Sequence, residues 1–356
     1  MWDISFYKDK KVLITGHTGF KGAWMCQLLQ MAGARVTGYA LESPTDPSLF
    51  HLCRLSEHMD SVLGDIRDLE HMKQVFERVQ PEIVIHMAAQ PIVRESYKNP
   101  VYTYETNVMG TVNLLECVRM SSSVKSFLNV TTDKVYRNKE LEWGYRENEE
   151  LNGYDPYSNS KSCSELVTGS YKDSFFSDGH VAISTARAGN VIGGGDFAAD
   201  RIIPDCIRAV QSQQDIIIRN PYSIRPYEHV LEPVTAYLMI AKAQYEDGSY
   251  AGNYNVGPDE ADCWATGELV TLFCDKWKQA AGSLVKWVNQ YDGGPHEANF
   301  LKLDCSKLKN TFGWQPKWSV ETAMEKIVEW SGVYIDGGDV AECTKRQIRE
   351  FCGFKE

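Results

Sequence analysis

Apolar residues in the first part of the chain occur either in short continuous runs or at intervals of three to four residues. Continuous runs at 11–15, 35–40 and 61–63 are typical of strands that are covered on both faces. The spaced pattern predicts helices over 23–32 and 69–79. We therefore expect strands and helices to alternate from the start of the chain.

The alternation continues along the chain. Strands are predicted over 83–85, 127–131 and 181–186, and a helix near 108–118. Strands that alternate with helices are joined by right-handed crossovers and form a parallel sheet with helices on both faces. The sequence thus predicts an α/β fold with a doubly wound, Rossmann-type parallel sheet.

The rhythm changes after about residue 189, where three consecutive glycines interrupt regular structure and prolines become frequent. From there on, short strands and helices are mixed. We expect a first domain over 1–190, with a returning segment at about 226–258. A smaller C-terminal α/β domain would consist of 191–225 and 259–356.

The composition is that of a globular protein and argues against several classes. The 356 residues are 43% hydrophobic and 24% charged, with a net charge of −11. An acidic chain argues against a nucleic-acid partner, because phosphate binding requires clustered Lys and Arg. The first residues show no signal-peptide pattern, and no stretch of about 18 apolar residues predicts a membrane span. We therefore expect a cytoplasmic protein without a membrane partner.

Cysteine and histidine spacing gives no sign of a metal centre. The ten cysteines form no CxxC pair, and the eight histidines form no HxH or HxxxH pair. We therefore expect free thiols and no metal site.

Three glycines follow the first predicted strand and open a helix. Gly16, Gly19 and Gly22 allow a tight turn, close approach of the backbone to a pyrophosphate, and close helix–sheet packing. Their place at the first strand–helix junction predicts a dinucleotide-binding domain. The GxxGxxG spacing resembles that of the short-chain dehydrogenase/reductase superfamily. Together with the positions that match this superfamily, the loop predicts these cofactor-binding residues: Gly16, His17, Gly19, Phe20, Lys21, Gly22, Asp65, Ile66, Ala88, Ala89, Gln90, Asn107, Tyr157 and Lys161.

The end of the second strand bears on the choice between NAD and NADP. An NAD site usually has an acidic residue there, but this chain has Tyr39, Ala40 and Leu41, with Glu42 one place late. No arginine follows for a 2′-phosphate, although His17 and Lys21 are expected to be within reach of that region. We predict NAD and leave NADP open.

A tyrosine and a lysine lie one helical turn apart, at Tyr157 and Lys161. A phenol has a pKa of about 10, too high for an efficient base at neutral pH. An ammonium about 4 Å away contributes roughly 4 kcal/mol at an effective dielectric of 20. We therefore expect Lys161 to lower the phenol pKa by up to about 3 units and make Tyr157 a usable base.

The fifth strand ends in Thr132, Asp133 and Lys134. Carboxyl ends of strands in a doubly wound sheet face the ligand crevice, so all three side chains are expected to point at substrate. Hydride transfer at one carbon requires only a hydroxyl and the tyrosine. The additional Asp–Lys pair therefore indicates acid–base chemistry at a second carbon.

These motifs, together with segments 187–196 and 225–233, resemble the nucleotide-sugar 4,6-dehydratases over nearly the whole chain. Members that act on dTDP-glucose carry Thr-Asp-Glu, and members that act on CDP-glucose carry Thr-Asp-Lys. The resemblance implies a lyase that converts CDP-D-glucose to CDP-4-keto-6-deoxy-D-glucose with bound NAD. Such an enzyme serves deoxysugar biosynthesis for cell-surface polysaccharide, including lipopolysaccharide O-antigen.

Other functions stay open at this point. A dTDP- or GDP-sugar 4,6-dehydratase and a UDP-sugar 4-epimerase are enzymatic alternatives, and a dinucleotide-sensing regulator is a non-enzymatic one. Asp133 and Lys134 speak against an epimerase, and the Tyr157–Lys161 pair speaks against a regulator.

The resemblance also implies catalytic roles. Tyr157, with Thr132 and Lys161, would take the proton of O4; Lys134 would take the C5 proton, and Asp133 would protonate the departing C6 hydroxyl.

By position in the family, a further set of residues is expected to bind the nucleotide sugar: Asn190, Arg201, Arg219, Arg225, His229, His296 and Glu297. Of these, Arg225 best suits the diphosphate, because the arginine fork matches phosphate oxygens. Apolar helices near 100–120 and 157–176 predict a homodimer or homotetramer.

Overall fold

The computed structural model describes residues 3–291 and 300–354. Its largest element is a seven-stranded sheet with the order β10-β6-β5-β4-β1-β2-β3, in which each neighbouring pair is parallel. The strands of this sheet are β1 (Lys11–Thr15), β2 (Arg35–Ala40), β3 (Asp60–Leu63), β4 (Ile83–His86), β5 (Ser126–Thr132), β6 (Ala182–Ala188) and β10 (Asn253–Val256). The predicted doubly wound fold is confirmed.

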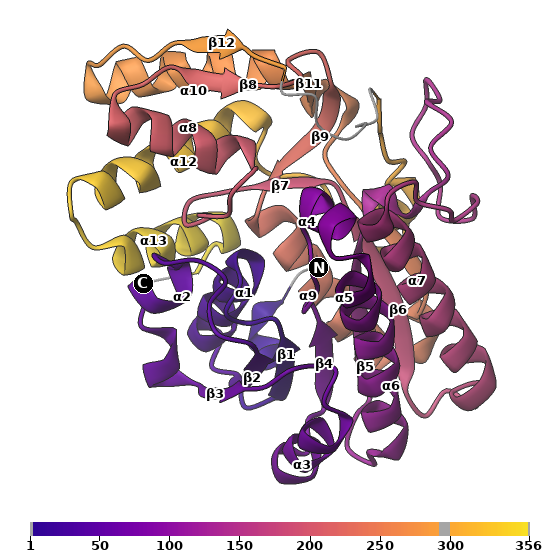
Figure 1. The fold of residues 1–356 in the computed structure, drawn as a ribbon. Helices are drawn as coiled ribbons and strands as arrows, with labels where there is room; N and C mark the ends of the chain where they lie inside the picture. The colour runs from indigo at the N-terminus through magenta and orange to yellow at the C-terminus, as the bar shows by residue number, and fades with distance from the viewer. Residues whose placement is uncertain (1–2, 292–299, 355–356) are drawn as a thin grey trace.

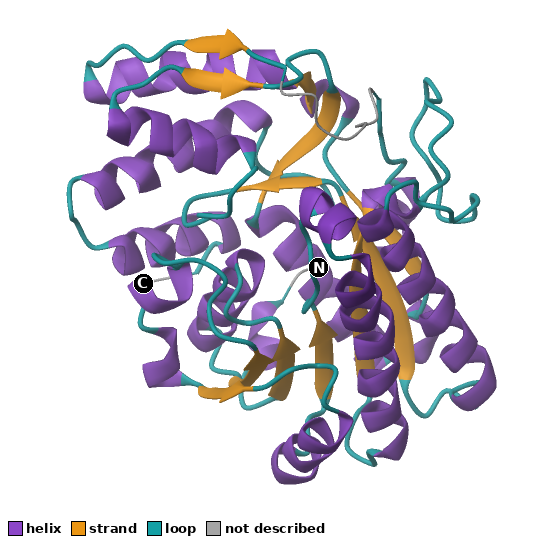
Figure 2. Ribbon diagram, in the orientation of Figure 1, coloured by secondary structure: helices purple, strands orange, loops and turns teal. Residues whose placement is uncertain are grey.

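Helices cover both faces of this sheet (Figures 1 and 2). They are α1 (Phe20–Met31), α2 (Leu49–Leu52), α3 (Leu69–Val79), α4 (Val93–Lys98), α5 (Pro100–Tyr104), a π-helical turn (Glu105–Met109), α6 (Gly110–Met120), α7 (Pro156–Phe175) and α9 (Leu231–Glu246). Helix α1 begins three residues before the predicted start at Ala23, with Gly19 as its N-cap. In the described residues, none of the helices is both long and apolar enough to cross a membrane.

The first strand shows why continuous apolar runs predict this sheet. Val12 and Ile14 belong to a core on one face together with Trp24, whereas Leu13 belongs to the core on the other face with Phe127. Successive side chains of a strand point to opposite faces, so a strand covered by helices on both sides has no solvent-facing position in its middle. A continuous apolar run therefore predicts this strand, because the helices on both of its faces present apolar side chains to it.

A second region has its own small sheets and core. Its strands are β7 (Asn190–Ile192), β8 (Ile216–Ile218), β9 (Ile224–His229), β11 (Cys263–Ala265) and β12 (Trp287–Asn289), in a three-stranded sheet β11-β9-β7 and a two-stranded sheet β12-β8. The helices are α8 (Ile202–Ser212), α10 (Thr266–Ala281) and α12 (Val320–Ile335), whereas α11 (Ser306–Phe312) packs against β10 and its Leu308 belongs to the core of the first region. Ile203, Phe273 and Ile327 belong to the hydrophobic core of the second region.

The second region lies over the end of the large sheet from which β4 leads to α4 (Figure 1). Because the strands are parallel, all of their carboxyl ends face this region. The last helix, α13 (Val340–Cys352), returns to the first region, where Ile348 and Phe351 join the core around Trp24. Strand β10 comes from the predicted returning segment. The predicted domain boundaries themselves stay a prediction.

Candidate active site

The glycine loop between β1 and α1 is shaped for a ligand backbone. Gly16 has a φ of +78°, and a Cβ there would lie 2.7 Å from the amide nitrogen of Ala88. A Cβ on Gly22 would lie 2.2 Å from the carbonyl oxygen of Gly16. At Gly19, the N-cap of α1, a Cβ would meet only that same oxygen, at 3.4 Å. Gly16 and Gly22 thus close the loop, while Gly19 keeps the helix N-terminus open to a phosphate.

His17 and Lys21 leave this loop in different directions. The His17 imidazole is buried over Gly38 and lies 2.7 Å from the Ser61 hydroxyl through Nε2, and burial lowers its pKa to about 4. Lys21 instead interacts electrostatically with Arg201 and Asp133. Burial and then the charge of Arg201 lower the Lys21 pKa to about 8. The expectation that Lys21 reaches the ribose region is therefore wrong, because its side chain turns toward the catalytic centre.

The ends of β2 and β3 are tied together. The Tyr39 hydroxyl donates to the carbonyl of Asp65 at 3.0 Å, so the side chain at the usual acidic position is buried inside the protein. The Asp65 carboxylate accepts from Arg67 at 2.7 Å, and this hydrogen bonding lowers the Asp65 pKa. Ile66 is buried against Gly110.

The segment after β4 is held by two side chains, Thr15 at the end of β1 and Asn107 before α6. The Thr15 hydroxyl accepts from the backbone of Ala88 at 3.1 Å. Asn107 accepts from the Gln90 amide at 2.8 Å and donates to the Ser160 hydroxyl at 2.9 Å, so it joins this segment to α7. The predicted residues Ala88, Ala89, Gln90 and Asn107 thus form one rigid wall beside the glycine loop.

Tyr157 and Lys161 lie at the start of α7, which is capped by Asp155. The Lys161 ammonium donates to the carbonyl of Val130 at 3.1 Å. Burial, and after it the charge of Lys21, lower the Lys161 pKa to about 7. Burial raises the Tyr157 pKa to about 12, although the Thr132 hydroxyl opposes this shift. In this structure burial disfavours the charged form of both groups and sets the direction of both shifts. The activation of Tyr157 by Lys161 stays a prediction.

A buried ion pair fixes α7 against β5 and β6. Arg187 donates to both carboxylate oxygens of Glu165, at 3.0 and 2.9 Å, and to the Tyr136 hydroxyl at 2.8 Å. Glu165 also accepts from the hydroxyls of Thr131 and Thr185. Because every charge is paired and hydrogen-bonded, this network holds the catalytic helix in one position.

Thr132, Asp133 and Lys134 follow the end of β5 and form a connected group. The Thr132 hydroxyl and the Lys134 ammonium both donate to Oδ1 of Asp133, at 2.9 Å each. Lys134 also donates to Asn190 at 3.3 Å. Lys134 is 30% exposed and Asp133 fully buried. The acid therefore lies on the floor of the centre and the amine at its rim.

Two polar residues on this floor were missed from the sequence. Glu228 in β9 is 2% exposed and the Tyr237 hydroxyl in α9 is buried, and neither side chain has a hydrogen-bond partner in the described part of the chain. Both interact electrostatically with Asp133. A glutamate in a short strand usually faces solvent, so its sequence neighbours do not predict that Glu228 is buried. Its burial depends on the packing of α9, which is distant in the sequence from the catalytic residues.

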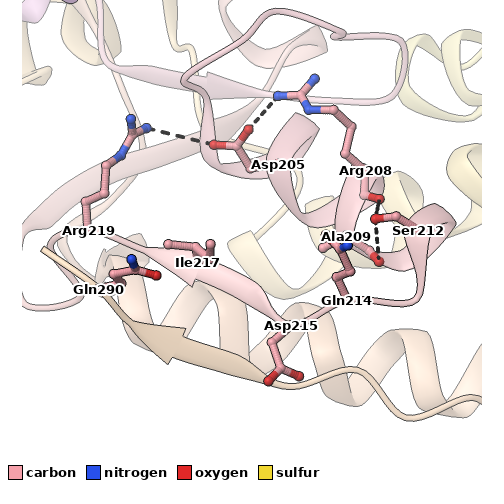
Figure 3. Close-up of a pocket in the computed structure, with 9 residues that line it drawn as sticks. All are labelled: Asp205, Arg208, Ala209, Ser212, Gln214, Asp215, Ile217, Arg219 and Gln290. Carbon is pink, nitrogen blue, oxygen red and sulfur yellow. Dashed lines mark hydrogen bonds and ion pairs between the residues drawn. The ribbon is translucent and has the colours of Figure 1, made fainter. Parts of the chain in front are cut away.

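The predicted substrate-binding arginines lie along the second region. Arg201 donates to Asp196 at 2.9 Å and interacts electrostatically with Tyr157, which brings it to the catalytic centre. Arg225 is 7% exposed in β9 and donates to the carbonyl of Ile224 at 2.9 Å. Arg219 donates to Asp200 at 2.5 Å. It lies in a surface pocket between α8 and β8 (Figure 3).

His229 is placed elsewhere than predicted. It is fully buried, with its ring 5.6 Å from Trp24 and 4.8 Å from Trp318. Neighbouring residues of a strand face opposite sides, so Glu228 faces the centre and His229 faces the core. We correct the prediction that His229 binds substrate. His296 and Glu297 lie outside the described residues.

A doubly wound sheet, a GxxGxxG loop and a Tyr–Lys pair one helical turn apart define an extended short-chain dehydrogenase/reductase. Residues 13–327 match the model of the GDP-mannose 4,6 dehydratase family, and the chain belongs to this family. It is 47% identical to the CDP-glucose 4,6-dehydratase of Salmonella typhimurium, over 99% of this chain and 98% of that protein. It is 29% identical to the dTDP-glucose 4,6-dehydratase of Haemophilus influenzae, over 75% of this chain and 80% of that protein.

Solved structures share the fold at low identity. The dTDP-glucose 4,6-dehydratase of Bacillus anthracis, in complex with NAD, superposes with a TM-score of 0.75 at 20% identity, covering 93% of this chain and 99% of that one. A UDP-glucose 4-epimerase of Thermotoga maritima gives 0.75 at 22% identity, covering 89% and 97%. Dehydratase and epimerase share this architecture, so the fold alone does not separate the two activities.

Proposed function

We propose that this chain is an NAD-dependent nucleotide-sugar 4,6-dehydratase that converts CDP-D-glucose to CDP-4-keto-6-deoxy-D-glucose. The observation that carries the proposal is the Asp133–Lys134 pair, hydrogen-bonded to Thr132 beside Tyr157. This pair supplies a second acid and base that a 4-epimerase does not need. The 47% identical relative named CDP-glucose 4,6-dehydratase supports the nucleotide.

The residues divide the proton transfers between two carbons of the sugar. Tyr157 accepts the proton of O4, with the Thr132 hydroxyl beside it. The 4-ketone then acidifies the C5 hydrogen, which Lys134 removes from the rim of the centre. Asp133 donates a proton to the C6 oxygen, which leaves as water. Lys134 finally returns a proton to C5.

The glycine loop and the wall formed by Ala88, Ala89, Gln90 and Asn107 fit a dinucleotide. Gly19 leaves the N-terminus of α1 open to the pyrophosphate, and the buried Tyr39 at the end of β2 offers no positive charge for a 2′-phosphate. We therefore favour NAD over NADP. A bound NAD would supply reversible hydride transfer, from C4 and back to C6, which would make the overall reaction redox-neutral.

The arginines of the second region suit a diphosphate. Arg201 and Arg219 are each paired with an aspartate, at 2.9 and 2.5 Å, so a phosphate competes with those carboxylates for the same guanidinium groups. Arg225 is a third candidate. The substrate contacts of all three stay predictions.

We also propose a homo-oligomer, a homodimer or homotetramer. Three apolar side chains on neighbouring helices are unusually exposed. They are Val101 of α5 (69%), Met109 at the end of the π-helical turn (51%) and Leu166 of α7 (58%). A cytoplasmic location stays a prediction from the sequence pattern, and a role in deoxysugar biosynthesis for surface polysaccharide stays a prediction from the family resemblance.

Product analysis tests the proposed function. Purified protein with NAD is incubated with one sugar nucleotide at a time: CDP-glucose, dTDP-glucose, UDP-glucose or GDP-mannose. The products are followed by NMR. We expect a C6 methyl group with a C4 ketone from CDP-glucose, formed faster than from the other nucleotides. An epimerised hexose that keeps its C6 hydroxyl would contradict the proposal.

A further inference from the structure

The proposed reaction leaves two groups in the wrong protonation state, and this inference rests on that proposed function. Tyr157 gains the proton of O4, whereas Asp133 loses one to the departing C6 oxygen. Lys134 gives back the proton that it took. A second turnover therefore requires one proton to leave Tyr157 and one to reach Asp133. Neither hydride transfer changes this proton balance.

The two oxygens of Asp133 face different surroundings. Oδ1 accepts from Thr132 and Lys134. Oδ2 is buried without a hydrogen-bond partner in the described residues. A buried carboxylate oxygen without a partner costs free energy unless water or a ligand bonds to it. Water on the floor beneath the catalytic residues can bond to this oxygen when the C6 hydroxyl of the substrate does not.

That floor is lined by Glu228, Tyr237 and Lys21. Glu228 is opposite Val191 in the pairing of β9 with β7, one residue from Asn190, which accepts from Lys134. The Lys21 ammonium lies 6.0 Å from the ring centre of Tyr237. Both oxygens of Glu228 and the hydroxyl of Tyr237 are buried and unpartnered in the described part of the chain. Several unsatisfied polar atoms gathered around one place are the usual sign of ordered water.

Charge makes Glu228 suited to store a proton. Burial, followed by the charge of Glu232, raises the Glu228 pKa well above its ordinary value; Asp133 adds to this shift and Lys21 opposes it. Glu228 is therefore the neutral acid next to the acid that is consumed. Tyr237 interacts electrostatically with Glu228 and with Tyr157, so its side chain lies near both of these groups.

We propose that Glu228 returns a proton to Oδ2 of Asp133 through ordered water after each elimination, and that Tyr237 passes the proton of Tyr157 back to Glu228. In the first transfer, neutral Glu228 becomes a carboxylate as Asp133 becomes neutral, and the bridging water receives and gives up one proton. In the second, Tyr157 loses its proton as Glu228 regains one. The loop is closed and needs no external acid. Glu228 thus acts through Asp133 rather than on the sugar.

Glu228→Gln tests the loop, because the amide keeps the shape of the side chain but cannot exchange a proton in this way. The first turnover uses the proton already on Asp133, so rapid quench with CDP-glucose should show a first-turnover rate within about two-fold of wild type. Steady-state turnover should fall about ten-fold or more, giving a burst of one product per active site. Tyr237→Phe should give the same burst with a smaller fall.

Glu82→Gln is the control. Glu82 comes directly before β4, at the end of the sheet opposite the catalytic residues, and its carboxylate accepts from the Tyr245 hydroxyl at 2.7 Å and from the Lys11 backbone at 3.1 Å. Both kinetic phases should stay unchanged. The proposed proton return is refuted if Glu228→Gln turns over at the wild-type steady-state rate. That result would mean that protons return through Thr132 or solvent. The proposed return is also refuted if first turnover and steady state fall equally. Absence of product from the wild type would instead refute the proposed function.

Discussion

The cofactor side and the substrate side of the crevice are built differently. On the cofactor side, Gly16 and Gly22 leave no room for a methyl group, and Asn107 ties the segment after β4 to α7 with bonds of 2.8–3.1 Å. On the proposed substrate side, Arg201 pairs with Asp196, and Arg219 pairs with Asp200 and Asp205; the two arginines are 35% and 28% exposed. The first side is fixed by packing, whereas the second is held by ion pairs that an anion can replace. This difference fits the proposed reaction, in which the cofactor ends each cycle unchanged while the substrate exchanges.

The glycines offer the largest test of this contrast. Gly22→Ala places a Cβ 2.2 Å from the Gly16 oxygen, so we expect loss of NAD binding together with a lower melting temperature. Gly19→Ala meets its nearest atom at 3.4 Å, so the melting temperature without cofactor should hold while NAD binding falls about ten-fold or more. Calorimetry and thermal unfolding measure both. Equal loss of stability in the two variants would mean that Gly19 serves packing alone.

On the substrate side, Arg225→Ala should mainly raise KM. Loss of one charge-assisted contact to a diphosphate is worth roughly 1.5–3 kcal/mol, so KM should rise about ten- to hundred-fold with little change in kcat. Arg349→Ala, which removes a surface pair with Glu342, is the control and should leave KM unchanged. An unchanged KM in Arg225→Ala would place this arginine outside the site.

The smallest expected effect is on the pH dependence of stability, and it concerns His229, which lies in the core. Burial and then the charge of Lys326 lower its pKa to about 3. The unfolded chain, with a histidine pKa of about 6.5, therefore binds more protons between about pH 3 and 6.5, so stability rises with pH in that window and levels off above it. His229 contributes about 1.4 kcal/mol of the loss between pH 7.5 and 5.5.

His229→Gln should flatten this acid dependence and leave KM for CDP-glucose unchanged. Urea unfolding at several pH values, with initial rates on the same preparations, measures both. A raised KM would restore His229 to the substrate site.

The sequence correctly predicted those features that depend on neighbouring residues alone. The first strands were predicted correctly because a parallel strand covered on both faces has no solvent-facing position in its middle and is therefore mostly apolar. The glycine loop was predicted correctly because the tight turn before the helix requires glycine. The pairing of Tyr157 with Lys161 also follows from helical spacing.

Long-range packing decided the rest. The turn of Lys21 toward the centre and the burial of Glu228 depend on α9 and β9, which lie more than two hundred residues from the glycine loop. His229 shows a different error: the segment was identified correctly, but the face of the strand was not. The pKa of Tyr157 depends on burial, which spacing does not reveal.

The central claim is that Asp133 and Lys134 perform an elimination that an epimerase lacks. The most direct test is solvent deuterium at C5, measured by NMR of the product and of enzyme-bound species in Lys134→Ala, with Tyr157→Phe beside it. Wild type should yield a 6-deoxy product with deuterium at C5. Lys134→Ala should accumulate reduced cofactor and an unlabelled 4-keto-hexose, while Tyr157→Phe should accumulate neither. A 6-deoxy product formed at the wild-type rate by Lys134→Ala would contradict the account.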